Sequence, residues 1–215
     1  TGDALANELR GGAGDDTLNG GAGNDVLIGE AGDDQLSGGA GDDVVVWALG
    51  DGDDVVEGGA GINVGRLTGS LTDADVVSLS ANGTAIAVNW NAGSDQPEFT
   101  GFTRLEITLG GGNDEATIGG LAATGVGSIT VFLGEGDDEV NATATDVALL
   151  VFGDAGDDEI LGGSAVDTLH GGEGDDHVAG GAGDDHLTGD AGDDVLEGGA
   201  GNDFIEGNDG ADVLI

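Results

Sequence analysis

The sequence predicts an all-β fold in which short strands wind into a solenoid. Gly-Asp-Asp recurs at a spacing of nine residues along much of the chain, and each copy joins a glycine-rich half to a short aliphatic half. A repeat of fixed length indicates a solenoid, because each unit buries its apolar face only against its neighbours. The 215 residues include 48 Gly and one Pro, but only two Trp and five Phe, which excludes the aromatic-rich core of an ordinary enzyme.

Eleven clear copies of the repeat fill residues 11–46 and 153–215. Looser copies begin at Gly2, Leu49 and Gly58, and in the last of these Asn63 replaces the usual Asp. The glycine-rich half predicts a tight turn, since Gly adopts backbone geometry that strains other residues. The next three residues predict a strand whose middle side chain points inward. The expected inward set is Leu18, Leu27, Leu36, Val45, Ile160, Leu169, Val178, Leu187, Leu196, Ile205 and Leu214.

The charge of the chain points to cations as partners. There are 44 acidic residues against three basic ones, a formal net charge of −41 at pH 7. Such a surface repels phosphate, which excludes nucleic acid as a partner and disfavours anionic lipid. One buried aliphatic side chain contributes about 1.5–3 kcal/mol, whereas ordering each residue costs about 1–2 kcal/mol of backbone entropy. A nine-residue unit therefore needs a further source of stability, and its adjacent carboxylates indicate multivalent cations.

The repeat Gly-Gly-x-Gly-x-Asp-x-U-x, in which U is a large aliphatic residue, resembles the RTX or hemolysin-type calcium-binding repeat. The resemblance covers about three quarters of the chain. It implies a parallel β-roll in which two units form one coil, with Ca²⁺ ions between turns that lie two units apart. It pairs Asp16 with Asp34, Asp25 with Asp43, Asp158 with Asp176, Asp167 with Asp185, Asp176 with Asp194, Asp185 with Asp203 and Asp194 with Asp212.

Calcium takes six to eight oxygen ligands, which carboxylates and backbone carbonyls supply. The carboxylates expected to bind it are those of Asp16, Asp25, Asp34, Asp43, Asp54, Asp114, Asp138, Asp158, Asp167, Asp176, Asp185, Asp194, Asp203 and Asp212. The carbonyls expected to add to them are those of Gly12, Gly14, Gly21, Gly23, Gly32, Gly41, Gly156, Gly163, Gly172, Gly174, Gly181, Gly183, Gly192, Gly199 and Gly201. Departures from the pattern at Leu5, Asn63 and Ala165 weaken the expectation for the adjoining sites.

Three blocks are expected along the chain: an N-terminal β-roll over 1–66, a central block over 67–152 and a C-terminal β-roll over 153–215. In the central block the turns with Asp114, Asp138 and Asp158 are spaced more widely than two units of the repeat. Alternating apolar stretches precede these turns, which predicts longer coils of one continuing solenoid.

The stretch 76–90 alternates around Asn82-Gly83, which is the strongest short signal for an antiparallel hairpin. Its tip, together with the loop Asn91–Glu98, is a candidate either for contact with a partner or for a cap over the interrupted coil.

One outward face is expected to be aliphatic. Val26 and Ile28 recur two units later as Val44 and Val46, and Trp47 follows in the sequence. We expect this strip either to be covered by the central hairpin or to form a subunit contact.

Catalytic motifs are absent from the sequence, which contains neither His-Glu-x-x-His nor Gly-x-Ser-x-Gly. The carboxylates resemble calcium ligands or solvated turn residues more than the partly desolvated acid of a glycosidase. His177 and His186 fall in successive repeats, which belong to opposite sheets, so a shared zinc site is not expected. We predict a protein without enzymatic activity.

Targeting signals are also missing. The chain opens on Thr1 without Met, shows no signal peptide and has no apolar run of about 18 residues, so we expect a processed or excerpted chain without direct membrane insertion. Cys is absent, and this fits either redox compartment.

The leading functional hypothesis is a secreted calcium-binding structural protein, extracellular or on the cell surface, which folds where calcium reaches millimolar levels. Export by a type I system is implied by the resemblance. Head-to-tail stacking into a filament or surface layer, as a homo-oligomer, is a specific hypothesis. The alternative is a calcium-binding region excised from a larger secreted toxin, adhesin or hydrolase. Glycan or ice recognition is disfavoured, because the outward positions show no regular Thr or aromatic array.

Overall fold

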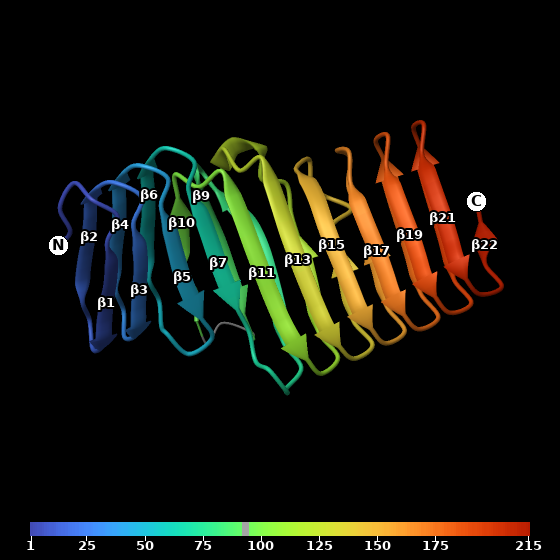
Figure 1. Ribbon diagram of the computed structural model, residues 1–215, viewed down its shortest axis with the longest axis horizontal. Coiled ribbons are helices and arrows are strands. Elements are labelled where there is room, and N and C mark those ends of the chain that lie inside the picture. Colours follow the sequence, from blue (N-terminus) through green and yellow to red (C-terminus); the bar gives the residue numbers. More distant parts are fainter. Residues whose placement is uncertain (92–94) are drawn as a thin grey trace. The chain divides into compact units, whose positions relative to one another are not determined.

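The computed structural model describes residues 1–91 and 95–215, and its regular elements are β-strands apart from one 3-10 turn, η1 (Ala122–Thr124). The strands wind as a parallel β-solenoid, so the expected fold class is confirmed (Figure 1). Contacts divide the chain into two compact units. The first comprises Thr1–Gly69, Leu79–Ile107 and Leu121–Gly127, and the second comprises Ser70–Ser78, Thr108–Gly120 and Ser128–Ile215.

In the first unit, successive strands alternate between two sheets, because each nine-residue repeat contributes one turn and one strand. One sheet pairs Val26 with Val44 and Ile28 with Val46 in parallel register, so the predicted aliphatic strip exists on its outer face. This sheet is formed in order by β1 (Glu8–Ala13), β3 (Val26–Ala31), β5 (Val44–Ala48), β7 (Val64–Thr68) and the first residues of β11 (Arg104–Gly111). The opposite sheet contains β2 (Thr17–Ala22), β4 (Gln35–Ala40), β6 (Val55–Ala60), β10 (Glu98–Thr100) and β9 (Ala85–Trp90).

The predicted hairpin is present, as β8 (Val76–Asn82) and β9, which are hydrogen-bonded neighbours joined by a short turn. β9 pairs antiparallel with β10, and β10 pairs parallel with β6. The hairpin therefore extends the sheet opposite to the aliphatic strip, and the expectation that it covers that strip is wrong. Trp47 does not lie beside the strip either, because it points into the core and packs against Trp90 at a ring distance of 5.5 Å.

The loop expected to contact a partner falls partly outside the described residues, which omit 92–94. Its described part packs against turns of the same unit. The Gly50 N–H donates to Asp95 Oδ2 at 2.8 Å, and the Gln96 N–H donates to Asp53 Oδ1 at 2.7 Å.

The second unit continues the same alternation with coils of unequal length. Glu115 pairs with Glu139, Glu139 with Glu159, and Glu159 with His177, so the coils shorten step by step toward the regular length of two repeats. This confirms the longer central coils. One sheet is formed by β13 (Ser128–Glu135), β15 (Ala148–Ala155), β17 (Thr168–Glu173), β19 (His186–Ala191) and β21 (Phe204–Asp209). The other is formed by β12 (Glu115–Ile118), β14 (Glu139–Asn141), β16 (Glu159–Leu161), β18 (His177–Ala182), β20 (Val195–Ala200) and β22 (Val213–Leu214).

The core lies between the two sheets of each unit and consists mainly of aliphatic side chains, joined in the first unit by Trp47, Trp90, Phe99 and Phe102. Leu27, Val45 and Leu187 are completely buried. Two members of the expected inward set differ: Ile205 is half-buried, and Leu214 is 49% exposed. Leu214 lies in β22, the last strand of its sheet within residues 1–91 and 95–215, so no other described strand pairs with its far side.

Candidate calcium-binding turns

The sixth residue of each repeat connects one coil to the next through its side chain. Its Oδ1 atom accepts a hydrogen bond from the backbone N–H of the sixth residue one coil earlier, as Asp34 does from Asp16 at 2.8 Å and Asp194 from Asp176 at 2.9 Å. The structure thus brings together every Asp pair expected from the repeat. In the first unit the connected residues are Asp16, Asp34 and Asp54 on one edge and Asn7, Asp25, Asp43 and Asn63 on the other. In the second unit they are Asp75, Asp114, Asp138, Asp158, Asp176, Asp194 and Asp212 on one edge and Asp167, Asp185 and Asp203 on the other.

The second carboxylate oxygen of these residues is, at most turns, buried without a hydrogen-bond partner. Asp43 and Asp176 illustrate this, with side chains 0% and 2% exposed and Oδ2 atoms that no donor reaches. A buried polar atom without a hydrogen-bond partner raises the free energy of the folded state. A buried charge raises it far more, unless a cation compensates the charge. The Oδ2 atoms concerned belong to Asp25, Asp34, Asp43, Asp54, Asp114, Asp138, Asp158, Asp176, Asp185 and Asp194.

Burial also shifts the acidity of these groups. It raises the pKa of Asp54, Asp158 and Asp176 to about 7 and that of Asp114 to about 6, with a further rise from neighbouring carboxylates and an opposing effect of the Oδ1 hydrogen bond. Burial likewise raises the pKa of Asp34, Asp43, Asp138, Asp167, Asp185 and Asp194. Without cations, these groups therefore keep their protons to a higher pH in the folded protein than in the unfolded chain.

A backbone carbonyl of the first glycine of the repeat one coil further on lies beside six of the ten orphaned oxygens, those of Asp25, Asp43, Asp158, Asp176, Asp185 and Asp194. A Cβ built on Gly38 would come within 2.5 Å of both Asp43 Oδ2 and Gly58 O. The missing side chain keeps open a space bounded by a carboxylate and a carbonyl, which suits an oxygen-seeking cation. The sequence prediction named the second and fourth glycines and missed the first, although its repeated occurrence was the available signal.

The second and fourth glycines serve the backbone of the turn. Gly12 and Gly41, for example, have φ values of 101° and 140°, a region that favours glycine. A Cβ on Gly41 would also collide with Gly23 O of the neighbouring coil. The predicted glycines with positive φ are Gly12, Gly14, Gly21, Gly23, Gly32, Gly41, Gly156, Gly172, Gly174, Gly181, Gly183, Gly192, Gly199 and Gly201. Gly163 is the exception, and its N–H donates to Asp167 Oδ2 at 2.9 Å.

No three His, Cys, Asp or Glu side chains of residues 1–91 and 95–215 converge as a metal-binding group. Any ion in these turns would therefore depend on backbone carbonyls as well as on the Asp side chains. His177 and His186 lie in β18 and β19, on opposite sheets as expected from the repeat.

Comparison with known families decides what these turns are. The model of the RTX calcium-binding nonapeptide repeat (4 copies) matches residues 1–36, 10–45, 49–64, 152–187 and 188–215, more than half of the chain. The chain belongs to the RTX calcium-binding repeat family. RTX repeats bind multiple Ca²⁺ ions, and the buried carboxylates described above occupy their sixth position. No curated protein matches the chain.

The hydrogen bonds that Oδ1 of the sixth-position residues accepts from coil to coil form a ladder, the Oδ1 ladder. This ladder extends beyond the residues that the family model matches. Asp114 and Asp138 lie between the matched segments, yet each has a buried, unpartnered Oδ2 and the same Oδ1 hydrogen bond. The extra residues of these longer coils lie away from the turn, in part at η1. The Oδ1 hydrogen bond and the buried Oδ2 are thus independent of coil length, although Leu109 and Leu133 replace the first glycine of these turns.

Two turns depart from the RTX consensus, and in both the side-chain atom at the Oδ2 position has a hydrogen-bond partner within the protein. Asn63 places an amide where other repeats have Oδ2, and its Nδ2 donates to Gly101 O at 2.9 Å and Gly59 O at 3.3 Å. In the repeat with Ala165, the Gly163 N–H reaches Asp167 Oδ2. These turns leave no orphaned oxygen at this position.

Within the described part of the chain, no helix has the length and apolar character needed to cross a bilayer.

Proposed function

We propose that this RTX protein is a secreted structural module that is unfolded at low calcium and folds when it meets extracellular calcium. The observation that supports this proposal is the series of buried carboxylate oxygens without a hydrogen-bond partner, repeated from coil to coil. Charged oxygens in such positions oppose folding until a cation compensates them. Weak extracellular calcium sites fill at about 10⁻⁴–10⁻³ M, so the change from cytoplasm to exterior would act as the folding signal.

The residues that would hold the ions follow from the turn geometry. Where a first glycine follows one coil further on, the ion would take Oδ2 of a sixth-position Asp and the carbonyl of that glycine, for example Asp43 Oδ2 and Gly58 O. The second and fourth glycines would add carbonyls. The bound ion supplies positive charge to the turn, while the chain's own Oδ1 hydrogen bonds fix the stacking of successive coils.

A calcium titration tests this proposal. Far-ultraviolet circular dichroism is recorded from EGTA to about 10 mM calcium, a range that spans weak extracellular sites, and isothermal titration calorimetry counts the ions. We expect the unfolded chain to gain β-structure as it takes up several calcium ions. Full β-structure in EGTA would contradict the proposal. Magnesium at equal ionic strength is the control, because its strict octahedral geometry suits these turns poorly.

Self-assembly is a second proposal, supported by the sheet edges. In the second unit, β22 is an edge strand, and its Val213 and Leu214 are 51% and 49% exposed. Unpaired edge strands are templates for pairing with another chain, so copies would stack end to end into a filament or surface layer. Light scattering at saturating calcium measures this directly, and a strict monomer would exclude it.

The same turns would serve a calcium-binding region of a larger secreted toxin, adhesin or hydrolase. Mass spectrometry of the protein isolated from its native source distinguishes this alternative, because it would detect a longer chain. In either setting we infer a structural role for these repeats, with no catalytic step assigned to them.

A further inference from the structure

Five aromatic rings form a continuous band on the outer face of one sheet in the second unit. They come from five adjacent strands, and their successive centroids lie 5.2, 4.9, 6.3 and 4.9 Å apart. The rings belong to Phe132, Phe152, His170, His186 and Phe204. The sequence-based expectation of no aromatic array at outward positions is therefore wrong. The rings remain accessible, since Phe132 and Phe204 are 37% and 54% exposed.

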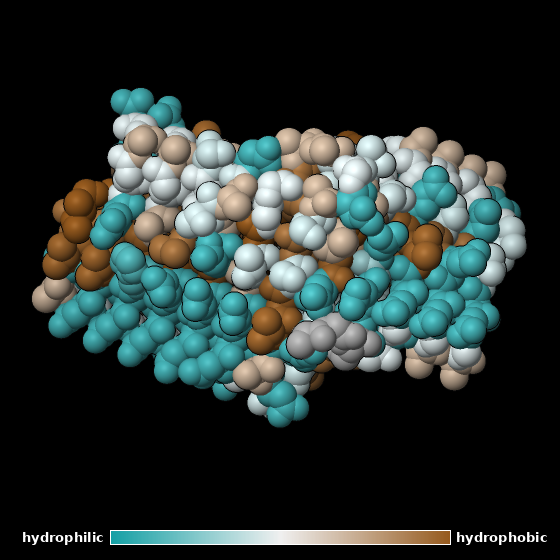
Figure 2. Space-filling view, turned by 180° about the vertical axis from the view of Figure 1, so that it is seen from behind, coloured by the Kyte–Doolittle hydropathy of each residue, from teal (hydrophilic) through white to brown (hydrophobic). Residues whose placement is uncertain are grey.

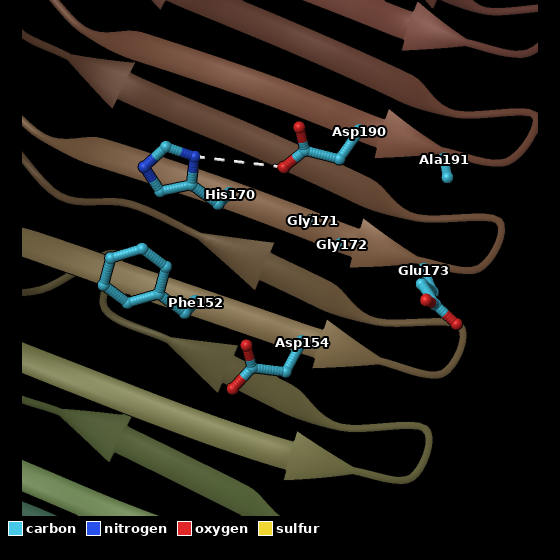
Figure 3. Close-up of a pocket in the computed structure, with 8 residues that line it drawn as sticks. All are labelled: Phe152, Asp154, His170, Gly171, Gly172, Glu173, Asp190 and Ala191. Carbon is cyan, nitrogen blue, oxygen red and sulfur yellow. Dashed lines mark ion pairs between the residues drawn. The ribbon is translucent and has the colours of Figure 1, made fainter.

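A pocket of about 340 Å³ opens at the centre of this band and is bordered by carboxylates. Figure 3 shows the Phe152 and His170 rings beside each other, with the carboxylates of Asp154 and Asp190 on the same side of the sheet and Glu173 at its margin. The pocket thus combines an aromatic surface with negative charge.

The histidine of this pocket is held in position by its neighbours. Thr188 Oγ1 donates to Asp190 Oδ2 at 3.2 Å, so it accepts from His170 Nδ1 at 2.7 Å. The His170 ring is stacked on Phe152 with an angle of 4° between the planes. Fixed side chains of this kind lose little entropy when a ligand binds.

Asp154 and Asp190 occupy left-handed backbone positions, with φ values of 71° and 76°. They pair in register with Gly172, which lies between them and fits this geometry without strain. Strained positions of this kind are often found at functional sites.

The first unit shows which group such a carboxylate attracts. Glu30 occupies the corresponding repeat position with a φ of 65°, and the guanidinium of Arg10 on the adjacent strand lies 3.4 Å from it. All three Arg of the chain, Arg10, Arg66 and Arg104, belong to the first unit. The second unit contains neither Arg nor Lys, so it supplies no guanidinium for Asp154 and Asp190. Asp190 instead accepts from Asn208 Nδ2 at 3.3 Å and lies 4.0 Å from His170 Nδ1.

We propose that the pocket formed by Phe152, His170, Asp154 and Asp190 binds an arginine side chain from a basic segment of another protein. A planar guanidinium stacks on an aromatic ring and donates paired hydrogen bonds to a carboxylate at the same time. The acidic border repels anionic polymers, and the charge of the pocket remains unmatched by a neutral ligand. A second copy of this chain is a poor ligand for this pocket, because the chain has only three basic residues and a net charge of −41.

The test uses the full chain at saturating calcium and constant ionic strength, with fluorescent peptides that are identical except at two positions carrying Arg, Lys or citrulline. Fluorescence anisotropy measures binding. We expect the Arg peptide to bind several-fold more tightly than the Lys peptide, because only Arg is planar, and the citrulline peptide to bind least because it is neutral.

Three variants locate the site. Asp190→Asn should weaken binding of the Arg peptide about tenfold, through loss of a charge-assisted hydrogen bond. The fold should persist, because Asn208 already occupies the same row with a φ of 72°. Phe152→Leu should weaken it about threefold. Glu30→Gln, in the first unit, is the matched control and should leave binding unchanged; circular dichroism in the same buffer verifies that each variant is folded.

Two results would overturn the proposal. Equal affinity for Arg and Lys peptides, with equal losses in Asp190→Asn and Glu30→Gln, would mean that the overall charge of the molecule attracts them. Binding of a neutral oligosaccharide such as cellohexaose, reduced by Phe152→Leu and unaccompanied by Arg-peptide binding, would make the band a glycan-binding surface instead.

Discussion

The turn at Asp176 and the turn at Asn63 differ in one atom that decides whether a cation is needed. Both side chains use Oδ1 to accept a backbone N–H from the preceding coil, at 2.9 Å for Asp176 and 3.0 Å for Asn63. At Asp176 the second oxygen is buried without a partner, whereas at Asn63 a nitrogen takes this place and donates to two carbonyls. The hydrogen-bond ladder is therefore common to both turns, and only the demand for positive charge differs. Outside these buried residues, Figure 2 shows hydrophilic side chains in rows along one margin of the surface.

Removal of calcium should produce the largest effect, because it acts on every Asp176-like turn together. One site contributes about 2.7 kcal/mol when free calcium is about 100 times its dissociation constant, and several sites add to more than the stability of an ordinary domain. We expect EGTA to abolish cooperative thermal unfolding, measured by calorimetry. A transition in EGTA as sharp as the one in calcium would contradict this.

Filling a single ion space should come next. Gly38→Ala places a methyl group against both Asp43 Oδ2 and Gly58 O, so it should remove one ion and cost about 3 kcal/mol in calcium. Urea unfolding at fixed calcium measures the change.

Gly12→Ala is the matched control for this variant. Its φ is 101°, but no atom lies within 4 Å of the added Cβ. It should cost about 1–2 kcal/mol from backbone strain alone and retain every ion. Equal ion counts in the two variants would refute the assignment of the first glycine.

Exchanging the two residue types should interconvert the two kinds of turn. Asp176→Asn should lower the number of bound calcium ions by one and make the calcium-free fold more stable, because an amide can donate to Gly189 O, which lies near the orphaned oxygen. Asn63→Asp should raise the ion count by one and destabilise the calcium-free fold. Calorimetric stoichiometry measures both changes, and an unchanged count in either variant would show that Oδ2 is not a ligand at that turn.

Acidity should have the smallest effect, and its sign should reverse with calcium. The folded-state pKa of Asp54, Asp158 and Asp176 is raised from 3.8 to about 7, so the folded chain binds more protons than the unfolded one between these values. Without calcium, β-structure should increase as pH falls from about 7 toward about 4, and it should be lost as pH rises through about 7. With calcium, protons compete for the same oxygens, and the same acidification should weaken ion binding. Circular dichroism across this range, with and without EGTA, checks the reversal.

The sequence predicts well which side chains of each coil point inward, and it predicts poorly the contacts between segments that lie far apart along the chain. Leu27 and Leu187 are buried as expected, because a period of two within a strand fixes which side chains point inward. The amide contacts of Asn63 follow only from the folded structure, since its partner Gly101 lies far along the chain, beyond the hairpin. The band through Phe132 and Phe152 could not be read from a regular spacing, because coils of unequal length set the register of their strands. The candidate site was visible as sixth-position Asp residues and as the second and fourth glycines, but the carbonyls of the first glycines were missed.

The Oδ1 ladder has a mechanical consequence. Its bonds join each coil only to the coils before and after it, as Asp176 is joined to Asp158 and Asp194. A pulling force on one end therefore loads one interface at a time, and the chain peels rather than ruptures as a whole. Each regular coil that detaches releases two repeats of chain, about 60 Å of contour length. Extension of the regular coils in a force experiment would proceed in even steps of this size, with the calcium concentration setting the force at which each step occurs.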